Sequence, residues 1–251
     1  MTRSNQNTQR QQKKMILRTN IISGANTYKN RFLGKNFLIV YCNKYIEIQF
    51  TAENFLHLTG VATRLTAENF YNNAVNSTLT LNNIIINRQN PYSIAFNKTN
   101  NLTQLHKILE EPSIILEDIT TQTTTFKIAL TEYNFTLCFN KYTDAVPYYT
   151  VCSHRVENKS MNIINKSKNA YFVDFILEKP TTAQKYDKIT YQDQTKQLPQ
   201  TIHHLIADNL KQLTHNTQIN WFVCFLIPHN KPIKWFTIQI TIQIQLQITN
   251  P

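Results

Sequence analysis

The sequence predicts an α+β fold in which N-terminal helices pack on an antiparallel β-sheet, with an extra helix and strand at the C-terminus. Helical patterns dominate before Pro112, whereas residues 113–178 consist of short apolar runs separated by short turns. Helices followed by strands with short links are typical of α+β rather than α/β proteins. The chain has 251 residues, 41% of them apolar, so it can bury a sizeable core.

The N-terminal half begins with a polar stretch, and residues 1–20 are predicted to form a basic arm that is disordered or weakly helical. A short helix is predicted next, closed by Gly34. Two strands follow, joined by a two-residue hairpin turn at Asn43 and Lys44. Residues 78–98 fit either a strand or a loop. The helices predicted in this half cover residues 25–33, 52–58, a segment starting near 66, and 99–110, and the strands cover 36–42 and 45–50.

The C-terminal half has the alternation expected of antiparallel strands. The polar residues 180–200 resemble a linker, a helix is predicted over residues 201–213, and residues 236–248 alternate strictly as one strand. We expect a basic arm at residues 1–20, one domain at 21–190 and a C-terminal extension at 191–251. The predicted strands of the sheet are 113–118, 124–130, 134–139, 147–153 and 171–178.

Charge and composition limit the possible functions. The net charge is +11, and residues 1–50 carry nine Lys or Arg against one acid, Glu47. Such an excess favours a polyanionic partner, although a solvated tail is the alternative. Three glycines, well separated, exclude a Rossmann fingerprint and a Walker loop. Without paired metal-ligand spacing, we expect no metal site.

The cysteines and the apolar runs bear on location. The four cysteines form no CxxC pair and lie in apolar runs, so we expect them to be reduced and buried. No run is long enough to span a membrane, and the first residues lack the pattern of a signal peptide. These features predict a cytoplasmic protein without a membrane partner. Delivery into a target or host cell is a separate expectation.

The segment KNFLIVYCNKYIEIQFTAENFLHLTGV, residues 35–61, resembles the fourth phage group of the Barnase–EndoU–colicin–RelE-like (BECR) nucleases. In that family a strand pair leads into a short helix of the form N-F-x-H-L-T-G. The resemblance covers residues 25–190 and implies helices on an antiparallel sheet, a nucleic-acid substrate and no cofactor. The motif positions here are Asn54, Phe55, His57, Leu58, Thr59 and Gly60.

RNA cleavage without a metal needs a base for the 2′-OH, an acid for the leaving oxygen and a cation for the phosphorane. His57 is the first candidate for proton transfer, and the alternative is a helix-end histidine that binds the last carbonyls. His154 and Arg155 form the second candidate group, with a polar turn as the alternative. The resemblance implies a late-strand hydroxyl, at Thr150 or Ser153. Glu53 is an alternative base, or else a helix cap.

Four further residues are candidates for substrate binding: Lys98, Thr59, Arg31 and Lys35. Lys98 is expected at the start of a helix, where a bound phosphate or simple solvent exposure would explain a cation. The basic arm is expected to follow a phosphate backbone without reading sequence, with a solvated tail as the alternative.

These observations predict a metal-independent endoribonuclease, a toxin of a phage or mobile element, that cleaves RNA by 2′-OH transphosphorylation. The expected partners are an RNA substrate (tRNA, mRNA or rRNA) and an immunity or antitoxin protein. Two alternatives remain open: a nucleic-acid-binding protein without catalysis, and a structural or partner-binding protein of a mobile element.

Overall fold

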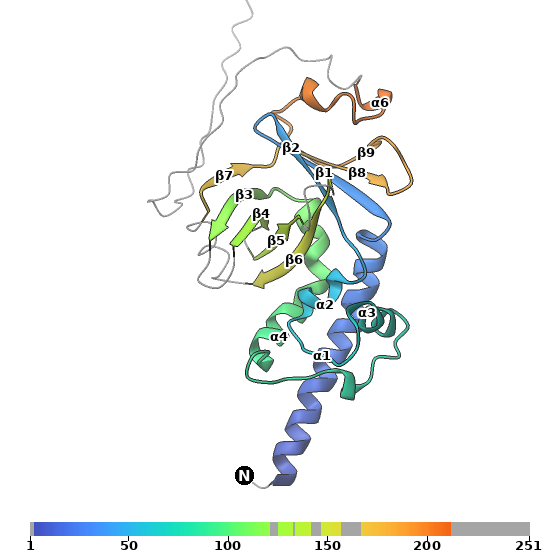
Figure 1. Ribbon diagram of the computed structural model, residues 1–251, viewed down its shortest axis with the longest axis vertical. Helices are drawn as coiled ribbons and strands as arrows, with labels where there is room; N and C mark the ends of the chain where they lie inside the picture. The colour runs from blue at the N-terminus through green and yellow to red at the C-terminus, as the bar shows by residue number, and fades with distance from the viewer. Residues whose placement is uncertain (1–2, 121–124, 133, 142–146, 157–166, 212–251) are drawn as a thin grey trace, which may run out of the picture.

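The computed structural model describes residues 3–120, 125–132, 134–141, 147–156 and 167–211. Helices from the N-terminal half lie below one end of a curled sheet, and the part of the chain described here contributes nine strands to that sheet (Figure 1). All pairs of neighbouring strands are antiparallel except one. The predicted combination of N-terminal helices with an antiparallel sheet is therefore confirmed.

The first helix, α1 (Arg3–Arg31), is longer than predicted. Its buried side chains follow one stripe at spacings of three or four residues: Leu17, Ile21, Ala25 and Tyr28. This stripe begins inside the segment predicted to be disordered or weakly helical, and the structure has the helical alternative over residues 3–20. The turns around Leu17 and Ile21 are stabilised by packing, and each polar residue before them extends the same helix by one further backbone hydrogen bond.

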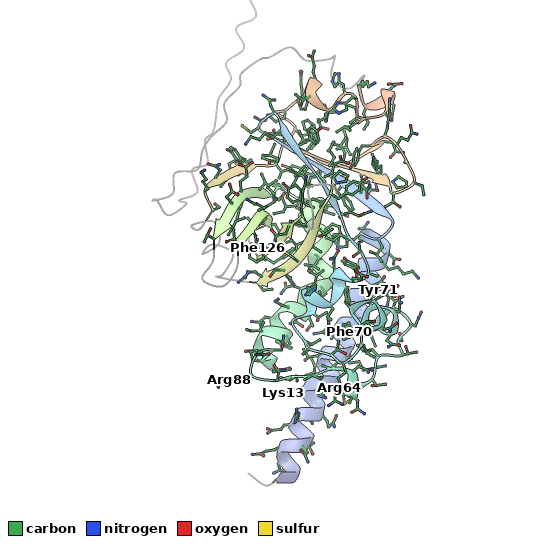
Figure 2. All side chains as sticks on the ribbon, viewed as in Figure 1. Lys13, Arg64, Phe70, Tyr71, Arg88 and Phe126 are labelled. Atoms are coloured by element: carbon green, nitrogen blue, oxygen red, sulfur yellow. The ribbon has the colours of Figure 1, made fainter. Side chains whose placement is uncertain are left out.

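Gly24 sets how closely α1 approaches the 3₁₀ helix η2 (Leu102–Leu109). A Cβ atom at Gly24 would overlap the side chain of Leu102, so only glycine fits this contact. On another side of α1, the ring of Tyr28 lies 6.0 Å from that of Tyr71, which belongs to α3 (Ala67–Val75). Figure 2 shows Tyr71 beside α1. The long helix is therefore the centre of the helical layer.

The other helical elements differ from the prediction mainly in residues 78–110. The ambiguous segment contains η1 (Leu81–Asn83) and most of α4 (Tyr92–Asn100), and the helix predicted at 99–110 is the end of α4 followed by η2. Lys98 therefore lies in the last turn of a helix, not at its start. A cation is favourable there because the last turn carries the negative end of the helix dipole.

The first two strands, β1 (Lys35–Tyr41) and β2 (Lys44–Gln49), form the predicted hairpin. Its turn is one residue earlier than expected, because Tyr41 pairs with Lys44. The two turn residues, Cys42 and Asn43, have φ values of 45° and 59°. Positive φ at both positions matches the twist of a two-residue hairpin.

The sheet has the order β7-β3-β4-β5-β6-β2-β1-β8-β9, and β2 pairs with β6 in parallel. The run predicted at residues 171–178 is divided between two strands, β7 and β8. The predicted linker at 180–200 contains a further strand, β9. The remaining strands are β3 (Ile114–Thr120), β4 (Thr125–Glu132), β5 (Phe135–Asn140), β6 (Tyr149–Val156), β7 (Asn169–Phe172), β8 (Phe175–Pro180) and β9 (Lys188–Gln192).

The curl of the sheet brings β3 close to β1, although β4, β5, β6 and β2 lie between them in sheet order. The hydroxyl of Tyr41 donates to Glu117 Oε1 at 3.0 Å, and Lys44 Nζ lies 3.2 Å from the same oxygen. Asn169 donates to Glu117 Oε2 at 3.2 Å. This carboxylate therefore links four strands at the end of the sheet that is remote from the helices.

The outer face of β1 and β8 is covered by the segment that follows β9. Leu38, Val40 and Leu177 pack there against side chains of η3 (Gln200–Ile202) and α6 (Asp208–Lys211). The predicted helix at 201–213 is thus two short helical turns within the described residues. The predicted strand at 236–248 lies outside the described residues.

The cysteines only partly match the expectation. Cys138 and Cys152 are free thiols, and burial raises their pKa values to about 12 and about 11. Cys42 is disulfide-bonded, so the prediction that all four cysteines are reduced is wrong for this residue. Cys224 lies outside the described residues. None of the described helices is long and apolar enough to cross a membrane.

Candidate active site

Strand β6 carries the expected late-strand residues, and an irregularity in it decides where they point. Cys138 of β5 pairs with Ser153, whereas the next residue, Phe139, pairs with Val151. Cys152 is therefore the extra residue of a β-bulge, which shifts the alternation of side chains. As a result, Val151 packs into the inner core and His154, three residues later, also faces inwards.

His154 is fully buried between the sheet and α2 (Asn54–Thr59). Its Nδ1 lies 3.1 Å from the carbonyl oxygen of Leu58, and its ring meets the edge of Phe135 with centroids 5.5 Å apart. Burial lowers the pKa of His154 to about 3, so the ring is neutral at pH 7. Because a carbonyl only accepts, Nδ1 carries the proton, and the buried Nε2 has no hydrogen-bond partner among the described residues.

His57 lies on the opposite side of α2 from this contact. Its side chain is exposed, while its neighbour Leu58 is fully buried. Glu53, four residues earlier, is also exposed and precedes the first turn with helical φ and ψ of −64° and −30°. Its side chain does not cap the helix, so the expected capping role is not observed. Side chains four residues apart share one helix face, which places both groups on the solvent side of α2.

Gly60 ends α2 with φ 71°, and α4 packs directly against it. A Cβ atom at Gly60 would lie 2.8 Å from Cδ of Lys98 and 3.4 Å from Cα of Ala95. The side-chain amide of Asn90 donates to the carbonyl oxygen of Gly60 at 3.3 Å. Lys98 is also close enough to His154 to help lower the pKa of that ring. The end of α2, the last turn of α4 and the inner face of β6 therefore meet at one junction.

Arg155 and Ser153 lie on the other face of β6. The guanidinium of Arg155 is 5.4 Å from the ring centre of Phe126 on β4, and Ser153 pairs with Cys138, a buried residue of the outer face. Thr150 lies on the same outer face by alternation, and its hydroxyl donates to the carbonyl oxygen of Asn140 at 3.3 Å. The structure therefore does not bring these three residues together with His57 and His154.

Three of the expected substrate-binding residues, Thr59, Arg31 and Lys35, form hydrogen bonds or ion pairs within the chain. The hydroxyl of Thr59 is buried, donates to the carbonyl oxygen of Leu56 at 2.7 Å and accepts from the Val61 amide. Arg31 forms an ion pair with Glu110 at 3.4 Å, and Lys35 forms one with Glu178 at 3.4 Å. Arg31 is the last residue of α1 and Lys35 is the first residue of β1, so neither belongs to the elements that meet at the junction of α2 and α4.

Residues 20–195 match the model of the family described as phage-Barnase-EndoU-ColicinE5/D-RelE like nuclease4. The chain belongs to this nuclease family. No curated protein and no solved structure matches the chain significantly. The match confirms the resemblance found in residues 25–190, and it identifies the protein as a nuclease of the BECR type whose substrate is a nucleic acid.

Three features of this BECR nuclease were missed in the sequence. The bulge at Cys152 reverses the face of the residues that follow it. The contact between Gly60 and Lys98 joins residues 38 positions apart. The network around Glu117 joins strands that are not neighbours in the sheet. Of these features, only Gly60 is recognisable in the sequence, because a glycine at the end of a predicted helix indicates a helix C-terminus.

The described residues contain no group of three or more His, Cys, Asp or Glu side chains that could hold a metal ion. Helix α2 instead exposes two groups capable of proton transfer, His57 and Glu53, and the residue that ends it, Gly60, contacts Lys98. These are the kinds of group that transfer protons and stabilise a phosphorane.

Proposed function

We propose that this BECR nuclease is an endoribonuclease that cleaves RNA by attack of a 2′-OH on the adjacent phosphorus. The observation that carries the proposal is the junction at Gly60, where Lys98 meets the end of the helix that exposes His57. A phosphate bound at Lys98 would lie next to that exposed face. The family match supports a nucleic-acid substrate, and the choice of RNA rests on the chemistry of these side chains.

We assign the two proton transfers to Glu53 and His57. His154, the second histidine expected to take part, is fully buried and neutral, which leaves Glu53 as the exposed group on the same face as His57. The Glu53 carboxylate takes the proton of the 2′-OH, and the O2′–P bond forms. Protonated His57 donates to the 5′-oxygen as the P–O5′ bond breaks, and Lys98 stabilises the phosphorane. The products are a 2′,3′-cyclic phosphate and a 5′-hydroxyl end.

In this proposal His154 is a positioning residue, since it holds the carbonyl of Leu58 beside His57. Thr59 has the same character, because its hydroxyl closes the last turn of α2. We assign no part in the chemical step to Arg155, Ser153 or Thr150, which lie on the outer face of β6.

The test is cleavage of total RNA by the purified protein in EDTA, with analysis of the product ends. We expect cyclic phosphate ends, and a loss of rate of about 10²- to 10⁴-fold in His57→Ala and in Glu53→Gln. His204→Ala and Glu68→Gln are matched controls, because both side chains are exposed and lie outside the junction. Full activity in His57→Ala, or 5′-phosphate ends, would contradict the mechanism. RNA binding without cleavage would favour a non-catalytic binding protein.

We further propose that cleavage of cellular RNA makes the protein a toxin of a phage or mobile element, neutralised by an immunity or antitoxin partner. Expression of the wild type in bacteria should then arrest growth, while equal expression of His57→Ala should not. Arrest by both forms would separate toxicity from the proposed chemistry.

A further inference from the structure

The N-terminal part of α1 projects beyond the rest of the fold and carries only positive charge. Residues 5–13 are all exposed, and Figure 1 shows this end of the helix extending away from the other helices. Over Arg3–Arg31 the helix has seven Lys or Arg residues and no acid. An exposed helix with one sign of charge is not stabilised by pairs within itself, so its charge is available to a partner.

The basic side chains of this part of α1 divide into two groups. Lys14 donates to the carbonyl oxygen of Leu81 at 2.9 Å, and Arg18 donates to those of Leu79 and Ser77 at 2.5 and 3.0 Å. These two residues fasten the helix to the segment that precedes and includes η1. In contrast, Arg10 and Lys13 are exposed and form no ion pair with any described residue.

Two arginines from other segments extend this charge around the helix. Arg64 and Arg88 are exposed and make no ion pair within the described part of the chain. Their segments are joined by a bridge between Ala62 and Ile85. Figure 2 shows Arg88, Lys13 and Arg64 in one row across the helical end. We call Arg10, Lys13, Arg64 and Arg88 the basic face.

Aromatic rings accompany the basic face on α4. Lys13 Nζ lies 5.1 Å from the ring centre of Tyr92, and that ring lies 5.5 Å from the ring of Phe96. Both rings are half-buried. Lys98 follows on the same helix, so Tyr92 and Lys98 are separated by about 9 Å along the axis at 1.5 Å per residue. Cations beside aromatic rings are typical of sites that bind unpaired nucleotides.

The negative charge of residues 101–150 also favours binding of a polyanion at the helical end. Residues 101–150 carry three Lys or Arg against six Asp or Glu, and they form η2 and the strands β3 to β5. A polyanion is therefore drawn towards the helical end and away from the middle of the sheet.

We propose that the basic face binds the phosphodiester backbone of single-stranded RNA, and that α4 leads this strand to the junction at His57 and Lys98. Tyr92 stacks against an unpaired base, and Lys13 holds a neighbouring phosphate. The proposal rests on the proposed function in one respect, namely that RNA is the substrate. It assigns binding to four side chains that take no part in the chemical step.

The test measures binding without cleavage. A fluorescent 2′-O-methyl RNA strand of about 12 nucleotides has no free 2′-OH, and its affinity is measured by anisotropy at several salt concentrations. The face variant combines Arg10→Gln, Lys13→Gln, Arg64→Gln and Arg88→Gln. The matched control combines Lys44→Gln, Lys107→Gln, Lys127→Gln and Lys188→Gln, four paired lysines outside the face. Both variants lose the same charge.

We expect the face variant to bind about 100-fold or more weakly near 0.1 M salt, with a salt slope lower by about 3, since each lost phosphate contact removes about 0.7. The control should change affinity by less than about threefold and keep its slope. The face variant should unfold at the wild-type temperature, because its four side chains have no ion-pair partners among the described residues, whereas the control loses four ion pairs and should unfold at a slightly lower temperature. Equal losses in the two variants, or an unchanged slope in the face variant, would overturn the proposal.

Tyr92 tests the single-stranded part of the proposal. Tyr92→Ala should weaken binding about tenfold, whereas Tyr92→Phe keeps the ring and should bind like the wild type. No effect of Tyr92→Ala, together with equal affinity for a duplex, would overturn this part. Wild-type protein that binds through the face but never cleaves RNA would contradict the proposed function alone. Cleavage and binding that survive in the face variant would contradict the face alone.

Discussion

The Nδ1 atom of His154 lies 3.1 Å from the carbonyl oxygen of Leu58, so a fully buried imidazole on β6 holds the last turn of α2. His57 immediately precedes Leu58, and its side chain is exposed. A change at His154 is therefore transmitted to the exposed face of α2 through one peptide unit. The same burial lowers the pKa of His154 to about 3, and this makes the contact sensitive to pH.

The protein should lose stability as the pH falls from about 6.5 towards 3. In this range the unfolded chain binds a proton at His154 and the folded chain does not, because burial lowers the pKa of His154 from its ordinary 6.5 to about 3. The free energy of unfolding should therefore fall by about 1.4 kcal/mol for each pH unit below 6.5 from this residue, and it should be level above 6.5. Urea unfolding at pH 4.5, 5.5, 6.5 and 7.5 measures the slope.

His154→Asn is the control for this slope. Asparagine offers an amide N–H close to the position of Nδ1 but does not titrate, so the variant should keep part of the bond to Leu58. We expect it to be less stable than the wild type at pH 7.5 and to depend less on pH below 6.5. An identical slope in both proteins would assign the pH dependence to other groups.

The bulge explains why the role of His154 was not foreseen. The sequence SHR after an apolar run predicts either a catalytic group at His154 and Arg155 or a polar turn, and regular alternation would have placed Ser153 inwards with Val151. One extra residue at Cys152 reverses this arrangement. A bulge depends on pairing with a partner strand, and the sequence of one strand does not contain that information.

Most of the sheet was predictable because alternation is a local property. The runs that became β1 to β6 were located within one to three residues. In contrast, α1 was predicted too short, because its polar first turns have no periodicity and extend a helix that Leu17 and Ile21 anchor by packing. The exposed His57 was found through the family motif. Its neighbours at the junction were not, because Lys98 reaches Gly60 only through the packing of α4.

A methyl group at Gly60 should impair both packing and cleavage. Gly60→Ala places an ordinary residue at φ 71° and brings its Cβ within 2.8 Å of Lys98 Cδ. We expect a loss of stability of about 2–3 kcal/mol, of which about 1–2 kcal/mol comes from the left-handed backbone. The displaced Lys98 should lower kcat for RNA cleavage. Steady-state kinetics and thermal unfolding measure the two effects.

Gly34→Ala is a close match for that substitution. Gly34 has nearly the same backbone, with φ 73°, but a Cβ atom there would meet nothing within 4 Å. It should show only the backbone cost and keep full activity. If both variants lose activity equally, the contact between Gly60 and Lys98 has no part in the site.

Glu117 should contribute more to stability than its exposed ion pair suggests. Its carboxylate accepts from Tyr41 and Lys44, on strands distant from β3 in sheet order, and from Asn169 on the neighbouring strand β7. Glu117→Ala leaves the half-buried donors of Tyr41 and Asn169 without their acceptor, which should cost about 1–3 kcal/mol. Lys44→Ala should cost less than about 1 kcal/mol, because the lysine side chain is 52% exposed. Chemical unfolding of both variants measures the difference, and equal costs would contradict this account.

Adjacent substitutions in α1 should have opposite signs. Replacing a helical glycine by alanine normally stabilises a protein by about 1 kcal/mol. Ser23→Ala should give a smaller gain, because the helix propensity of serine lies between those of glycine and alanine. Ser23 is exposed, so the substitution removes no packing. At Gly24 the new Cβ would overlap Leu102, and the backbone of η2 would have to move. Overpacking of this kind costs about 1–3 kcal/mol, so we expect Gly24→Ala to destabilise the protein despite its better helix propensity. Thermal unfolding distinguishes the two signs. A stabilised Gly24→Ala would mean that α1 and η2 are less closely packed than the structure describes. Leu102→Ala should not rescue Gly24→Ala, because the nearest atom to the new methyl group is Cβ of Leu102, which alanine keeps.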